Sequence, residues 1–405
     1  MLSTSPPKGP VFGLASFELV DAPGIPSVED LPYKVFTTSG RAAIFQALLQ
    51  IQLPPDSVVL VPTYHCPTMV APVLLAGHRP VYFGIRPDGL PDVDGIDATA
   101  SAHARAMLVS HYFGLAQSLH EVRAWCDARG IVLVEDCAHC YFGQAGDRPV
   151  GAWGDYCTAS LSKFFPVPEA GLLGSHTRPL TPLALRRQGL KSQVKGLVDV
   201  LETGTKHQRL GYFNRSLAGV FRLKHKAEPL SMPEQPGASP ISADAMLEAC
   251  DMARIDRRPL AISMLLRRML PRGRIITQRQ RNFSLYAEML SDLNGARPLV
   301  ALPTKPVAPY VFPLWVDDAD RVYHALRTQG APVFRWDRIW PDTPALPHDA
   351  GLQWSEHVLQ LLCHQDLYEA DIRQTVQHLK TVLNLVPATP GQENASMTQA
   401  EPCLY

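Results

Sequence analysis

The chain has 405 residues, of which 46% are hydrophobic and 19% are charged, a composition typical of a globular protein large enough for two domains. It excludes a disordered or fibrous chain. The 38 basic residues balance the 38 acidic ones, so no overall positive charge draws the protein to nucleic acid or to an anionic membrane.

Strands and helices alternate in the first part of the sequence. Short apolar runs predict strands, and stretches with apolar residues every three or four positions predict helices between them. We expect strands at residues 34–37, 57–62, 80–85, 106–110, 131–135 and 172–175, and helices at 40–50, 68–76 and 118–129. Nearly continuous apolar strands that alternate with helices indicate an α/β protein with a mostly parallel sheet covered on both faces.

The alternation fades after residue 175 and returns later in the chain. We expect helices at 181–202, 242–254 and 278–293, then strands at 310–316 and 332–336 with helices at 318–329 and 370–383. The last eighteen residues are polar and aperiodic, which predicts a mobile tail. The predicted organisation is an N-terminal arm (1–34), a large domain (35–270), a smaller C-terminal α/β domain (271–387) and the tail (388–405).

The sequence favours a cytoplasmic location. It contains no run of about eighteen uncharged apolar residues, and its first ten residues, MLSTSPPKGP, lack the basic-then-apolar order of a signal peptide. Eight cysteines are too few for a disulfide framework in a chain of this length, so we interpret most of them as reduced core residues.

Chemically able side chains follow several of the predicted strands. Ligands bind beyond the carboxyl ends of the strands in sheets of this kind, so these positions are where chemistry is expected. They read Ser39-Gly40-Arg41, Thr63-Tyr64-His65-Cys66, His111-Tyr112-Phe113-Gly114 and Asp136-Cys137-Ala138-His139.

An acidic residue and a lysine form the strongest constellation. Asp136 closes the apolar run VLVED, and Lys163 follows 27 residues later in the loop TASLSKFFPVPEAGLLGS. An enzyme that uses pyridoxal 5'-phosphate needs both groups. The lysine amine forms a Schiff base with the cofactor, and the carboxylate keeps the pyridine nitrogen protonated so that the ring accepts electrons. Taken alone, either residue has an ordinary explanation, as a turn carboxylate or a solvated lysine.

Six segments resemble, in order and spacing, the blocks of the sugar aminotransferase family known as DegT/DnrJ/EryC1/StrS. The resemblance covers roughly residues 35–175 and weakens through the C-terminal part. The segments are SGRAA (39–43), VLVPTYHCPTMVAPVLLAGHRPVYF (59–83), VSHYFG (109–114), GIVLVEDCAH (130–139), GAWGDYCTASLSKFFPV (151–167) and GLLG (171–174).

The resemblance implies an aspartate-aminotransferase-like fold (fold type I) and a homodimer with active sites at the subunit interface. It implies that pyridoxal 5'-phosphate is bound at Lys163, that Asp136 pairs with the pyridine nitrogen and that His139 contacts the phenolic oxygen. Gly40 and Arg41 lie where the family holds the phosphate, and a helix N-terminus suits that anion on physical grounds as well. Arg41 replaces a threonine of the family and is either a guanidinium contact or a solvated residue.

Other positions depart from the family pattern. The phosphate-binding serine five residues before the lysine is Thr158 here, and Ser160 is the alternative. The aromatic residue that stacks on the cofactor aligns near His65 and Cys66, of which only His65 has a π face. The asparagine that the neighbouring subunit contributes in this family aligns with Asn214.

Two further motifs have competing interpretations. Cys137 and Cys140 form a C-x-x-C that could indicate redox or zinc chemistry, but no second such pair exists, so we expect no metal. Nine arginines between residues 254 and 281 are interpreted as a solvated helix face or as a site for a nucleotide-sugar diphosphate. The absence of interleaved aromatic residues argues against nucleic acid.

The sequence therefore predicts an aminotransferase. The resemblance implies glutamate as the amino donor and a nucleotide-linked keto-sugar as the acceptor. A keto or aldehyde group on a secondary metabolite is the alternative acceptor, and a non-catalytic or regulatory family member is the alternative function. Sugar dehydration, in which a histidine replaces the lysine in some relatives, loses its main support because Lys163 is present.

Overall fold

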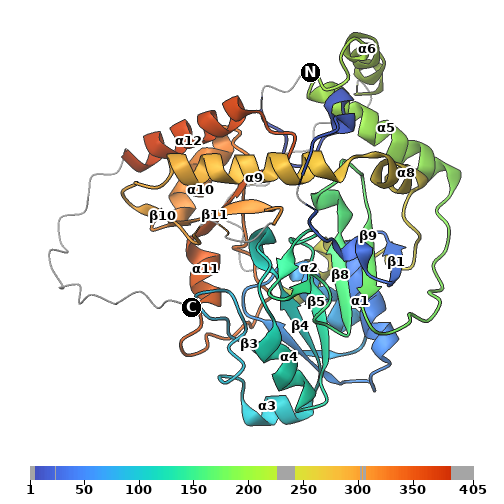
Figure 1. The fold of residues 1–405 in the computed structure, drawn as a ribbon, viewed down its shortest axis with the longest axis vertical. Coiled ribbons are helices and arrows are strands. Elements are labelled where there is room, and N and C mark those ends of the chain that lie inside the picture. The colour runs from blue at the N-terminus through green and yellow to red at the C-terminus, as the bar shows by residue number, and fades with distance from the viewer. Residues whose placement is uncertain (1–4, 23, 226–241, 302, 304–306, 385–405) are drawn as a thin grey trace.

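The computed structural model describes residues 5–22, 24–225, 242–301, 303 and 307–384. The larger of its sheets has seven strands in the order β1-β9-β8-β5-β4-β2-β3 (Figure 1). The strands from β8 to β3 are parallel neighbours, and β9 runs antiparallel to both β8 and β1. The strands are β1 (Tyr33–Thr37), β2 (Val58–Pro62), β3 (Arg79–Phe83), β4 (Ala104–Ser110), β5 (Val132–Asp136), β8 (Tyr156–Ser160) and β9 (Gly171–Ser175).

Helices cover both faces of this sheet, as the uniformly apolar strands predict. Successive residues of β2 point to opposite faces: Leu60 belongs to a buried cluster with Val122, whereas Val59 and Val61 belong to another with Ile44. The connecting helices are α1 (Gly40–Ile51), α2 (Pro67–Leu75), α3 (Ala98–His103) and α4 (His120–Asp127), and a small hairpin is formed by β6 (Gln144–Ala145) and β7 (Arg148–Pro149).

A second sheet is antiparallel throughout and has the strand order β10-β11-β13-β12. Figure 1 shows α9 between this sheet and the helices α5 and α8. The strands are β10 (Ala296–Pro298), β11 (Val311–Val316), β12 (Val333–Arg335) and β13 (Val358–Leu362). The helices are α5 (Leu190–Lys206), α6 (Phe213–His225), α7 (Ala243–Ala249), α8 (Ala261–Met269), α9 (Arg272–Met289), α10 (Ala319–Thr328), α11 (Gly351–His357) and α12 (Glu369–Asn384).

The predicted fold class is confirmed, with differences in individual elements. The helix expected from residue 181 begins at Leu190, because Pro182 disfavours helix before it and the Arg186 amide instead donates to the carbonyl of Asp256. The segment TASLSK, interpreted as loop, contains the end of the buried strand β8. The domain boundaries remain predictions, and the predicted tail, 388–405, lies outside the described residues.

Among the described residues, no helix is both long enough and apolar enough to span a membrane.

Gly171 allows the sheet to approach the first turn of α1. It is the first residue of β9 and pairs with both Thr37 and Ser160. A Cβ atom at this position would overlap the carbonyl group of Ser39, the residue that caps α1. Glycine is therefore required where the strand meets the helix N-terminus that faces the ends of β5 and β8.

We expect Gly171→Ala to lower the free energy of unfolding by about 3 kcal/mol, because the added methyl group displaces the Ser39 backbone. Gly219→Ala is the control, since nothing lies within 4 Å of the position that its methyl group would take and alanine is the better helix former. Urea denaturation measures both. Equal stability of the two variants would show that the close approach is not a constraint.

Candidate active site

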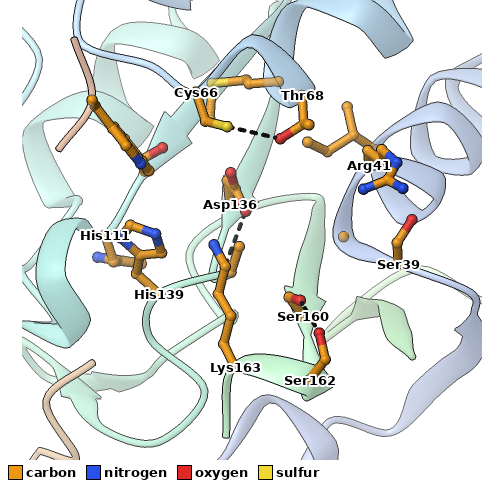
Figure 2. Close-up of a pocket in the computed structure, with 16 residues that line it drawn as sticks. Ser39, Arg41, Cys66, Thr68, His111, Asp136, His139, Ser160, Ser162 and Lys163 are labelled. Atoms are coloured by element: carbon orange, nitrogen blue, oxygen red, sulfur yellow. Dashed lines mark hydrogen bonds between the residues drawn. The ribbon is translucent and has the colours of Figure 1, made fainter. Parts of the chain in front are cut away.

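A cavity of about 220 Å³ lies at the carboxyl ends of β4, β5 and β8 and the N-terminus of α1 (Figure 2). The residues that follow these strands in the sequence predict a ligand site at this edge of the sheet. Its lining comes from both the large sheet and the segment after β12. The lining residues are Ser39, Gly40, Arg41, Ile44, Cys66, Thr68, Met69, Ser110, His111, Asp136, Ala138, His139, Ser160, Ser162, Lys163 and Trp336.

Lys163 ends the short 3-10 turn Leu161–Lys163 that follows β8. Its side chain extends into the cavity towards Asp136 (Figure 2), and its Nζ lies 5.2 Å from the centre of the Tyr310 ring. Burial lowers the pKa of the Lys163 amine, while Cys66 and Asp136 act in the opposite direction. A lowered pKa increases the fraction of neutral amine, which is the nucleophilic form.

Asp136 is the last residue of β5, and the strand register places it beside Thr158 of β8. Its Oδ1 accepts hydrogen bonds from the Ala138 amide at 3.0 Å and from the Thr158 hydroxyl at 3.3 Å. Burial raises the pKa of the Asp136 carboxyl, and Lys163 is the largest opposing influence. A positive charge in the cavity would therefore favour the ionised carboxylate further.

His139 lies against two aromatic rings, those of Tyr310 and Trp336. The centre of its ring is 4.4 Å from that of Tyr310 and 4.8 Å from that of Trp336. Burial and the charge of Lys163 lower the pKa of His139 well below its usual value, so the ring is neutral at pH 7. Its Nδ1 is buried and has no hydrogen-bond partner among the described residues.

His111 lines the cavity through a fixed hydrogen-bond arrangement with Glu135. His111 Nε2 donates to Glu135 Oε2 at 3.0 Å, and Nδ1 accepts from the Gln117 amide. The Glu135 oxygens also accept from the amides of Gly151, Trp153 and Gly154.

The His111–Glu135 arrangement also bears on metal and redox chemistry. Ligand atoms of His111, Glu135 and Cys137 lie within 4.8 Å of one another. The hydrogen bonds already occupy the carboxylate of Glu135, so we interpret the three residues as structural. Cys137 and Cys140 are both buried free thiols, and burial raises the pKa of each, which disfavours the reactive thiolate.

The other end of the cavity is rich in small polar groups. Gly40 and Arg41 form the first turn of α1, where helix amides have no partner within the helix, and Ser39 caps the turn by accepting from the Ala42 amide. The hydroxyls of Ser160 and Ser162 lie 3.3 Å apart and both residues line the cavity. Figure 2 shows Ser39, Arg41, Ser160 and Ser162 on the same side of Lys163.

Arg41 is held by the segment that follows α7. Its Nε donates to the backbone carbonyl of Asp251 at 3.1 Å, and its Nη2 lies 3.3 Å from the carboxylate of the same residue. The side chain is thus an ion-paired wall of the cavity.

Three of the predicted site residues do not line the cavity. Thr158 is buried outside the cavity lining, and its hydroxyl donates to Oδ1 of Asp136. His65 is also buried, and both ring nitrogens are used: Nδ1 contacts the carbonyl of Pro62 at 2.8 Å, and Nε2 accepts from the Trp340 amide at 2.9 Å. Asn214 lies near the start of α6, where its Oδ1 accepts from the Leu210 amide. Its predicted role in a neighbouring subunit remains a prediction.

Several cavity residues were not among the site residues that the sequence predicted. Cys66, rather than His65, faces the cavity, and Ser39, His111 and Ser162 line it as well. Their position after predicted strands or beside predicted site residues was the available signal. Trp336 follows β12 in the C-terminal part, and only the packing of the small sheet against the large one reveals it.

The nine arginines between 254 and 281 mostly link segments that are distant in the sequence. Arg254 pairs with Glu169 at 2.6 Å, Arg272 with Asp30 at 2.9 Å, and Arg274 with Asp366 at 2.8 Å. None of the nine lines the cavity that contains Lys163. Ion pairs give six of the nine arginines a structural role within the fold.

Comparison with known proteins identifies the first part of the chain. Residues 30–192 match the DegT/DnrJ/EryC1/StrS aminotransferase family. The resemblance that the motifs indicated is confirmed.

Two curated relatives are sugar enzymes by name. The chain is 28% identical over 170 residues to GDP-perosamine synthase of Vibrio cholerae, covering 41% of this chain and 46% of the relative. It is 26% identical over 193 residues to UDP-N-acetyl-3-dehydro-alpha-D-glucosamine 3-aminotransferase of Acidithiobacillus ferrooxidans, covering 47% of this chain and 50% of the relative. The chain thus spans about half the length of these curated relatives.

Solved structures extend the likeness in fold over most of the chain. The aminotransferase TlmJ of Streptoalloteichus hindustanus has a TM-score of 0.57 and 19% identity, covering 87% of this chain and 86% of TlmJ. NtdA of Bacillus subtilis, solved with bound PMP, has a TM-score of 0.55 and 16% identity, covering 90% of this chain and 78% of NtdA. These likenesses confirm the predicted aspartate-aminotransferase-like fold.

The buried ring of His65 predicts a loss of stability in acid. Burial lowers its pKa from 6.5 to about 4, so between these pH values the unfolded chain binds more protons than the folded one. The unfolding free energy then falls as pH decreases through this window, by about 2 kcal/mol for this residue between pH 7 and 4.5.

His65→Asn keeps a donor and an acceptor but does not titrate. We expect its unfolding free energy, measured by urea denaturation at several pH values, to fall by about 2 kcal/mol less than that of the wild-type protein over the same range. Parallel pH dependences would contradict a neutral buried His65.

Proposed function

We propose that the chain is a pyridoxal 5'-phosphate-dependent aminotransferase that transfers an amino group from an amino acid to a keto-sugar. The observation that carries the proposal is that the Lys163 amine and the Asp136 carboxyl line one cavity beside a helix N-terminus and influence each other's pKa. The family match over residues 30–192 supports it.

The residues of the cavity fit the chemical groups of this cofactor. The first turn of α1 offers backbone amides for a phosphate, with Ser160 and Ser162 beside it. The carboxyl of Asp136 suits a protonated pyridine nitrogen, and the neutral His139 has a buried nitrogen that lacks a partner. When bound, the cofactor supplies an aldehyde for the amine and a ring that accepts electrons from the substrate carbon.

The chain's own side chains then have distinct roles. Lys163 would hold the cofactor through its amine, and the lowered pKa of that amine suits it to accept and return a proton. Asp136 keeps the ring nitrogen protonated, and Thr158 holds the carboxylate in place. Gly40, Arg41 and Ser160 bind the phosphate end.

The substrates rest on family likeness and on the size of the site. We propose glutamate as the donor and a nucleotide-linked keto-sugar as the acceptor, since the relatives named above are sugar enzymes. The cavity of about 220 Å³ is smaller than the roughly 300–1,000 Å³ that holds a drug-sized ligand. The nucleotide would therefore lie outside it.

A homodimer in the cytoplasm is part of the proposal. Large apolar side chains are exposed on α5 and on the segment that leads into α6, including Leu190 (80% exposed) and Tyr212 (99% exposed), which suits an interface with a second copy. The cysteines at 66, 126, 137, 140, 157, 250 and 363 are free thiols, as expected in a reducing compartment.

Lys163→Ala should abolish the visible absorbance of lysine-bound cofactor and slow the reaction with glutamate by about 1,000-fold or more. Asp136→Asn should keep the absorbing species but lower turnover by about 100-fold or more, because the ring nitrogen loses its anionic partner. Absorbance spectra and single-turnover kinetics measure both. Lys191→Ala, at the exposed start of α5, and the exposed Asp94→Asn are controls, and turnover by Lys163→Ala at the wild-type rate would defeat the proposal.

Ser160→Ala and Thr158→Val distinguish the two candidates for the phosphate contact. Ser160 lines the cavity and Thr158 does not, so we expect Ser160→Ala to weaken cofactor binding about 10- to 100-fold through loss of a hydrogen bond to a charged group. Thr158→Val should lower turnover about tenfold through Asp136, with little change in affinity. Fluorescence titration with the cofactor measures the affinities. The reverse pattern would assign the phosphate to Thr158.

A further inference from the structure

Arg279, in the middle of α9, has a fully buried guanidinium without an anionic partner. Its side chain is 0% exposed, and no carboxylate of the described residues lies within 4 Å of it. Instead Nη2 donates to the backbone carbonyl of Lys163 at 2.6 Å, Nη1 to that of Pro309 at 3.0 Å, and Nε to Oε1 of Gln365 at 3.0 Å.

A buried cation held only by neutral oxygens is costly for the fold. Burial lowers the pKa of Arg279 to about 10, so the group remains charged at pH 7. Moving such a charge out of water carries a large penalty unless every donor is satisfied. An apolar side chain would fill the same space without this cost, which implies a specific use for the fixed donors of arginine.

The oxygens that Arg279 contacts belong to three separate segments. They are the turn that carries Lys163, the segment that enters β11 and the segment that follows β13. Gln365 reinforces the first link, because its Nε2 donates to the carbonyl of Phe164 at 2.7 Å. The Phe164 ring lies 4.5 Å from the guanidinium carbon. Two successive carbonyls of the lysine turn are therefore held from the C-terminal part of the chain.

The same contacts place an aromatic ring beside the lysine amine. Arg279 holds the carbonyl of Pro309, and the following amide, of Tyr310, donates to the carbonyl of Phe113 at 2.8 Å. The Tyr310 ring then lies 5.2 Å from Nζ of Lys163 and 4.4 Å from the ring of His139. One guanidinium thus fixes both the backbone of the lysine and a neighbour of its amine.

We propose that Arg279 is a positioning residue that holds the backbone of Lys163, so that the amine faces Asp136 and the Tyr310 ring. This inference rests on the proposed function. The lysine side chain must bind the cofactor and later move a proton. Because Arg279 holds the Lys163 carbonyl, the side chain extends from the same Cα position in both tasks.

α9 contributes Ile275 and Ile276 to a buried cluster with the large sheet, and Phe283 and Tyr286 to the core of the small sheet. It thereby makes the geometry of the lysine depend on how the small sheet is packed.

Arg274 offers a matched control on the same helix. It is also largely buried, and it donates to Oδ1 of Asp366 at 2.8 Å and to the carbonyl of Gln365 at 3.1 Å. It makes no hydrogen bond to the lysine turn. Lysine at either position keeps the charge but cannot reach several acceptors at once. The two variants therefore differ in one respect: only Arg279→Lys removes a hydrogen bond to the Lys163 carbonyl.

The experiment compares wild type, Arg279→Lys and Arg274→Lys, using pyridoxal 5'-phosphate as the probe. It measures the cofactor dissociation constant, the pH midpoint of the visible absorbance, the fraction of Lys163 trapped by borohydride in peptide mass spectra, and kcat and KM with glutamate. We expect Arg279→Lys to weaken cofactor binding and to lower kcat by about 10- to 100-fold each, with KM for glutamate little changed, because the amine is displaced. The pH midpoint should shift as well.

Arg274→Lys should lower the melting temperature but leave the pH midpoint, the affinity and kcat within about twofold of wild type, since a lost hydrogen bond away from the site costs only stability. Wild-type behaviour of Arg279→Lys, or equal effects of both variants, would overturn the inference. If Arg279→Lys does not fold, Gln365→Leu, which removes the bond to the Phe164 carbonyl, decides by the same readouts. Failure of the wild-type protein to trap the cofactor at Lys163 would instead refute the proposed function.

Discussion

The site depends on two opposite charges sharing a cavity that penalises both. Burial lowers the pKa of the Lys163 amine and raises that of the Asp136 carboxyl, and each group partly offsets the effect on the other. The parallel pairing of β5 with β8 places Asp136 beside Thr158, and Lys163 follows the end of β8 by three residues. Main-chain hydrogen bonds between two strands thus control the chemistry of two side chains.

The two acidic residues at the end of β5 show how one strand serves both structure and function. Neighbouring residues of a strand point to opposite faces of the sheet. Glu135 therefore faces the loop at 151–154 and accepts its amides, whereas Asp136 faces the cavity. Because Glu135 also fixes His111, it shapes one wall of the cavity that Asp136 lines.

The C-terminal part of the chain completes the site although the family match ends at residue 192. Trp336 lines the cavity, the Tyr310 ring lies near the lysine amine, and Arg279 contacts the backbone of Lys163. The matched segment contributes Lys163, Asp136 and the first turn of α1 to the cavity, and the remainder contributes walls and support.

The sequence alone determined the alternation of strands and helices, because buried parallel strands require continuous apolar runs. It also placed Gly40 and Asp136 at one edge of the sheet, since residues after parallel strands gather there, whereas Lys163 was indicated by the family resemblance and not by a predicted strand. It did not decide whether His65 or Cys66 faces the cavity, since side-chain direction after a strand follows from the local turn and its packing. Nor could it single out Arg279 among nine arginines, because the carbonyls it contacts lie up to 116 residues away in the chain and meet only in the folded structure.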